Sequence, residues 1–73
     1  MENNWVKIAT YTNELTSELA KVLLEQHGIV VVLLNKQDSS FKFGKIELLV
    51  QEGDAKNAQE IINEQNEKGI DEN

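Results

Sequence analysis

The chain has 73 residues, no cysteine and a formal net charge of −6. This length predicts one domain with a small core, and the lack of cysteine excludes disulfides, thiolate metal sites and thiol catalysis. The acidic balance disfavours binding to nucleic acid or to an anionic membrane surface, since both need basic patches. The longest apolar run is far too short to span a bilayer and no secretory signal precedes it, so we expect a cytoplasmic protein.

Residues 5–11 alternate between two kinds of side chain and are rich in β-branched and aromatic residues, which is typical of a strand. Alternation predicts two faces: Val6, Ile8 and Thr10 on one, and Trp5, Lys7, Ala9 and Tyr11 on the other.

A helix is predicted next, from Glu14 to His27, because Asn13 or Thr12 can cap its start and Gly28 can end it. Its apolar residues recur at helical spacing and predict one core-facing stripe: Leu15, Leu19, Val22 and Leu23. Truncation of Leu19 is then expected to cost about 2–4 kcal/mol, as core truncations do.

Residues 29–34 form an unbroken apolar run whose length and β-branching favour a strand. Residues 44–51 alternate again and predict a third strand after a loop of about nine residues. A second helix follows Gly53 and Asp54 and fades near Lys68, so we expect residues 1–68 to form the domain and 69–73 a frayed tail. Its apolar stripe is Ala55, Ala58, Ile61 and Ile62.

The order strand, helix, strand, strand, helix predicts an α+β fold. We expect the third strand to lie antiparallel between the first two, with both helices on one face, which is a ferredoxin-like fold without its last strand. The first strand is then an open edge, and the uncovered face is a candidate interface. The candidate residues on it are Trp5, Ala9, Tyr11 and Leu49. A weak homodimer through this edge or face is expected.

Several short motifs occur in order along the chain: Thr10–Asn13, Glu18–Lys21, Leu23–Ile29, Ile46–Val50 and Asp54–Ala58. Together they resemble a small prokaryotic family of domains of unknown function that are described as signal-transducing proteins. The resemblance implies a fold similar to that of PII-type regulators and a regulatory role, with no catalytic residues to carry over.

The predicted hairpin loop is locally positive and aromatic, with Lys36, Phe41, Lys42, Phe43 and Lys45. Such a loop suits a small anionic ligand or an acidic partner surface. In PII-like regulators the loop in this position makes the signalling contacts, so the resemblance favours a functional loop. The alternative is an ordinary loop whose phenylalanines pack on the core.

The remaining polar residues offer no recognisable set of acids, bases and nucleophiles, so we expect no catalytic residue, cofactor or metal site. His27 is expected to cap the first helix, and the glutamates of the second helix to be solvated. We therefore expect a non-enzymatic regulatory or signal-transducing domain whose partner is a protein or a small anionic ligand. The alternative is an interaction or self-assembly module without a small ligand. A lysine-lined pocket would favour the first and a flat apolar face the second.

Overall fold

The computed structural model describes residues 4–36 and 44–70 of the chain. Its elements follow the predicted order, β-α-β-β-α, with one turn of 3-10 helix added before the last helix. They are β1 (Trp5–Tyr11), α1 (Glu14–Glu25), β2 (Val31–Lys36), β3 (Lys45–Gln51), η1 (Glu52–Asp54) and α2 (Ala55–Ile70). The predicted α+β class is confirmed.

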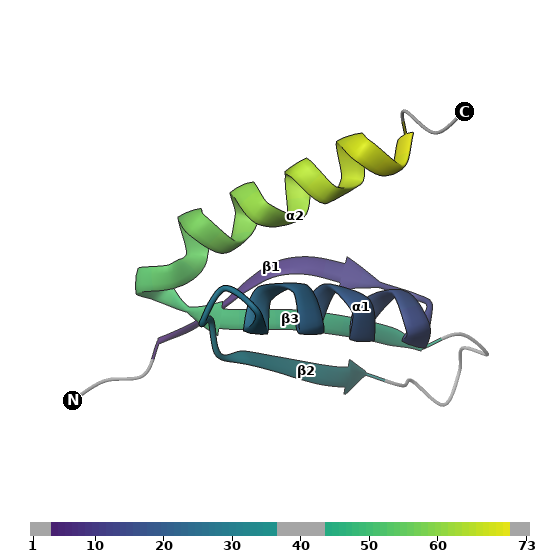
Figure 1. The fold of residues 1–73 in the computed structure, drawn as a ribbon. Coiled ribbons are helices and arrows are strands. Elements are labelled where there is room, and N and C mark those ends of the chain that lie inside the picture. The colour runs from purple at the N-terminus through teal and green to yellow at the C-terminus, as the bar shows by residue number, and fades with distance from the viewer. Residues whose placement is uncertain (1–3, 37–43, 71–73) are drawn as a thin grey trace.

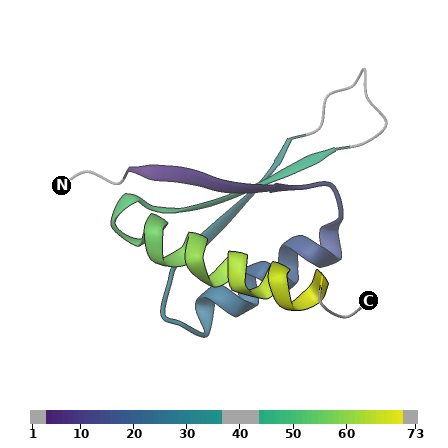
Figure 2. The same cartoon turned by 90° about the horizontal axis from the view of Figure 1, so that it is seen from above.

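The three strands form one antiparallel sheet with β3 at its centre, between β1 and β2. Both helices lie on the same face of this sheet (Figures 1 and 2). Helix α1 contacts mainly β2, and α2 contacts mainly β1. This is the ferredoxin-like arrangement without its last strand, as the sequence predicts. In the described part of the chain, β1 and β2 are both edge strands, and no helix covers the other face of the sheet.

The ends of α1 are set by local signals that the sequence carries. The side chain of Asn13 accepts a hydrogen bond from the backbone N–H of Thr16 at 3.1 Å, which caps the first turn. Gly28 follows the helix with a φ of +79°, a left-handed conformation that strains other residues. The helix itself stops at Glu25, two residues before the predicted end, and a turn covers residues 26–28. Strand β2 accordingly begins two residues later than predicted.

The core lies between the sheet and the two helices and consists of aliphatic side chains. Its buried members are Leu24, Ile29, Val31, Leu48, Val50, Ala58 and Ile62. On α2, Ala58 and Ile62 are buried while Ala55 and Ile61 are half-buried against them, so the predicted stripe of this helix is confirmed. The helix continues to Ile70, slightly past its predicted end.

Helix α1 packs with a different face from the predicted one. Leu15, Leu19 and Val22 are 68%, 62% and 47% exposed, whereas Leu24 is fully buried. Because a helix turns once every 3.6 residues, Leu24 lies on the side opposite this stripe. The prediction that Leu15, Leu19 and Val22 face the core is therefore wrong.

Small side chains explain why α1 packs in this orientation. The face that meets the sheet carries Ser17, which is fully buried, and Ala20, which is half-buried. The hydroxyl of Ser17 donates a hydrogen bond to the carbonyl oxygen of Glu14 at 2.7 Å, so its burial leaves no polar atom unsatisfied. Small residues let a helix approach the sheet closely, and the larger leucine stripe is left facing solvent.

Candidate functional site

A β-bulge in β1 decides which side chains reach the uncovered face of the sheet. Lys7 pairs with Leu49 of β3, but Ala9 pairs with Leu48, so Ile8 is an extra residue in the ladder. Residues opposite one another in an antiparallel pair share a face. The alternation of β1 therefore changes phase at Ile8.

Beyond the bulge, two predicted positions lie on the other face of the sheet. Ala9 and Tyr11 pair with Leu48 and Ile46, both buried, and pack against the core. Thr10 takes the place predicted for them on the uncovered face. The prediction that Ala9 and Tyr11 face away from the helices is wrong, because simple alternation does not anticipate a bulge.

We call the uncovered surface the open sheet face and define it by strand pairing. Its members alternate with the core residues of the three strands: Trp5, Lys7, Thr10, Val32, Leu34, Lys36, Lys45, Glu47, Leu49 and Gln51. Trp5 and Leu49 therefore lie on this face, as predicted. Lys36 and Lys45, predicted as loop residues, face each other at the end of the β2–β3 ladder and belong to it too. The other predicted loop residues, Phe41, Lys42 and Phe43, lie outside the described residues.

A glutamate on the central strand holds lysines from both edge strands. The carboxylate of Glu47 lies 3.6 Å from Nζ of Lys7 and 3.8 Å from Nζ of Lys36. Pairs of this kind stabilise a fold by about 0–1 kcal/mol, so these contacts matter mainly for the charge of the face and little for stability. With Lys45, the face carries three lysines and one glutamate in a chain whose net charge is −6.

Apolar side chains cross the same face between these charges. Val32 lies directly opposite Leu49, and Leu34 follows on the same side of β2. Trp5 lies diagonal to Leu49 across the β1–β3 pair, within reach of a large side chain. Trp5 and Leu34 are 38% and 43% exposed. The apolar side chains of the open sheet face thus run from Trp5 through Leu49 to the β2 edge, and the charged side chains lie together beside them, towards the end where Lys36 faces Lys45.

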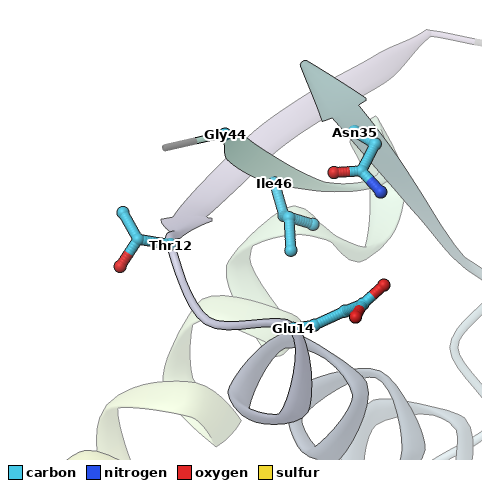
Figure 3. Close-up of a pocket in the computed structure, with 5 residues that line it drawn as sticks. All are labelled: Thr12, Glu14, Asn35, Gly44 and Ile46. Carbon is cyan, nitrogen blue, oxygen red and sulfur yellow. The ribbon is translucent and has the colours of Figure 1, made fainter. Parts of the chain in front are cut away.

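A small hollow of about 180 Å³ lies at one end of the sheet, on the helix side (Figure 3). It is lined by Thr12, Glu14, Asn35, Gly44 and Ile46. Figure 3 shows Ile46 pointing from β3 towards the start of α1, with Thr12 on one side, Asn35 on the other and Glu14 below it. Pockets for small molecules usually measure roughly 300–1,000 Å³. The hollow is small for such a ligand, no lysine among the described residues lines it, and Glu14 disfavours an anion.

Other predicted polar residues serve the fold. The Nδ1–H of His27 donates to the carbonyl oxygen of Leu23 at 3.0 Å, so this histidine caps α1 as predicted. Over residues 4–36 and 44–70, no group of three or more histidine, cysteine or acidic side chains is placed to hold a metal. No helix in those same ranges is long and apolar enough to cross a membrane.

Tyr11 gives a test of its own placement, because it is the only tyrosine in the chain. Burial raises the pKa of its phenol above the ordinary value of 10.0. The folded state then holds the proton more tightly than the unfolded state. The free energy of unfolding is therefore expected to keep this contribution below pH 10.0 and to lose it as the pH rises through the folded pKa. Denaturant titrations across the alkaline range should show this loss in the wild type and a smaller loss in Tyr11→Phe. Equal losses in both proteins would place Tyr11 in solvent.

The strand order, the bulge and the charged face together define a small α+β domain with one open sheet face in its described part. Residues 5–66 match the sequence model of a family described as "putative prokaryotic signal transducing protein". The chain belongs to this family, and the resemblance seen in the sequence is confirmed. No curated protein and no solved structure matches the chain.

Proposed function

We propose that this chain is a non-enzymatic signal-transducing module that binds a protein partner through its open sheet face. The family is described in terms of signal transduction, which supports a regulatory role. The observation that carries the proposal is the combination of exposed Trp5 and Leu34 with two lysines that lie beside Glu47 on the same face. Aromatic anchors beside positioned charges are typical of protein interfaces.

The chemistry of the face describes the partner. A surface that fits it has a band of apolar side chains with carboxylates along one side of that band, opposite the three lysines. Strands of six or seven residues in a three-stranded sheet give a face of about 20 Å by about 15 Å, or on the order of 300 Å². Interfaces of this size belong to weak and transient complexes, which suits signalling.

Binding of a small anionic ligand is the other function that the sequence suggests. The geometry of the described residues favours it less than it favours binding of a protein. Among the residues that the structure describes, none that lines the hollow beside Glu14 is positively charged. The described lysines Lys36 and Lys45 lie instead on the flat open sheet face. We therefore place the binding of a protein ahead of the binding of a metabolite.

A charge reversal with a matched control tests this proposal. Lys36→Glu on the open sheet face and Lys56→Glu on α2 change the net charge equally, and both side chains are exposed. The tagged full chain should co-purify a partner from cells of its source organism, and Lys36→Glu should lose at least about tenfold of it. Lys56→Glu should retain it. Equal recovery with all three proteins would refute the open sheet face as the binding surface.

Amide NMR titrations separate the two kinds of ligand. Nucleotides, 2-oxo acids, amino acids and divalent cations should cause no saturable shifts in the full chain. Saturable shifts at Thr12, Glu14 and Asn35 would instead support a metabolite sensor that uses the hollow at the end of the sheet.

A further inference from the structure

The exposed stripe of α1 is a second surface that the fold leaves unexplained. Leu15, Leu19 and Val22 recur at helical spacing, and all three are exposed on the side of α1 turned away from the core. A contiguous apolar stripe on a small protein marks an interaction surface more often than single exposed leucines do.

Charged side chains run beside this stripe along the whole helix. Each of Glu14, Glu18 and Lys21 precedes a stripe residue by one position, and Glu25 continues the row. Lys21 lies 3.9 Å from Glu25 and pairs with it, which leaves the row negative near the start of α1. The outer face of α1 is therefore apolar with an acidic margin.

This description matches the partner that the open sheet face requires. That face has an apolar band from Trp5 through Leu49 to the β2 edge, with Lys7, Lys36 and Lys45 beside it. The stripe is about 10 Å long, since its ends are seven residues apart at 1.5 Å per residue. It is short enough to lie within the width of about 15 Å that three strands give. The two surfaces are therefore complementary in charge and comparable in size.

We infer that a second copy of this chain lays the outer face of its α1 on the open sheet face, so that the chain assembles head to tail. This inference rests on the proposed binding role of the open sheet face and names its occupant. Symmetric pairing of like faces is disfavoured, because each open sheet face carries a net positive charge and each outer face of α1 a net negative one. The two surfaces lie on opposite sides of the two-layer fold (Figure 2), so a head-to-tail contact leaves one of each free and allows further growth.

Two variants, each with one of the two surfaces damaged, provide the test. Lys36→Glu damages the open sheet face, and the double variant Leu15→Gln, Leu19→Gln damages the stripe while keeping strong helix formers on α1. Sedimentation velocity of the wild-type chain up to about 1 mM should show an average mass that rises past that of a dimer and falls with added salt. Each variant alone should remain monomeric. An equimolar mixture should form a dimer and nothing larger, because one intact surface of each kind remains.

The controls distinguish the alternatives. Lys56→Glu should assemble like the wild type, and thermal melts by circular dichroism should show that all variants fold. A wild-type chain that stays monomeric throughout would overturn the inference. So would an assembly that stops at a dimer and is not restored by mixing the two variants, since that indicates a symmetric interface. If the chain is monomeric while Lys36→Glu still loses a co-purified protein, the proposed function stands and the self-assembly fails.

Discussion

Leu24→Ala is expected to lower the free energy of unfolding by about 3 kcal/mol, and Leu19→Ala on the same helix to change it by less than about 0.5 kcal/mol. Leu24 is fully buried between α1 and the sheet, whereas Leu19 is 62% exposed. Truncation of a buried leucine loses apolar contacts and leaves a cavity. Truncation of an exposed one replaces a good helix former with a better one.

The effect of Leu24→Ala is large for this chain. The free energy of unfolding of a domain is about 0.05–0.15 kcal/mol per residue, so a chain of 73 residues has roughly 4–11 kcal/mol in total. The expected loss should lower Tm by roughly 10–20 °C. Urea titrations of both variants with the wild type give the comparison directly. Equal losses at Leu19 and Leu24 would mean that α1 buries the leucine stripe after all, and the assembly inferred from its exposure would then lose its basis.

The difference between these two leucines also shows where sequence patterns were informative and where they were not. The caps of α1, Asn13 and Gly28, are local signals, so the start of the helix and its termination before Gly28 were predictable. The face of α1 that packs against the sheet is decided by tertiary contacts. Periodicity favours the larger residues, but Ser17 and Ala20 let the helix approach the sheet, and no single-residue pattern reports that preference.

The candidate site was predictable to a similar extent. Alternation along β3 placed Leu49 on the uncovered face, and the strand order followed from the chirality of the crossover. The bulge at Ile8 was not predictable, because a strand with one extra residue contains the same kinds of residue as a regular strand. The ion pairs of Glu47 with Lys7 and Lys36 also depend on register between strands that are far apart in sequence.

Central strand β3 joins the two functions of the sheet, since its residues face the core and the open sheet face in turn. Ile46, Leu48 and Val50 are buried, and the residues between them contribute to the open sheet face. Neighbouring substitutions on this strand should therefore have separable effects. A substitution at a core-facing residue should act on folding, and a substitution at its neighbour on the open sheet face should act on binding.

Leu48→Ala is expected to cost about 3–5 kcal/mol, because this side chain on the central strand is fully buried in the hydrophobic core. Leu49→Ala should cost less than about 1.5 kcal/mol, since Leu49 is only half-buried, opposite Val32. Denaturant midpoints measure both effects.

The binding readouts should rank these variants in the opposite order. Leu49→Ala leaves the fold intact but removes an apolar group from the middle of the open sheet face, so it should weaken both co-purification of a partner and concentration-dependent assembly. A Leu49→Ala protein that is as stable and as active in binding as the wild type would argue against the open sheet face. A Leu49→Ala protein that unfolds as readily as Leu48→Ala would mean that both faces of β3 are covered, and the surface on which the function rests would not be free to bind.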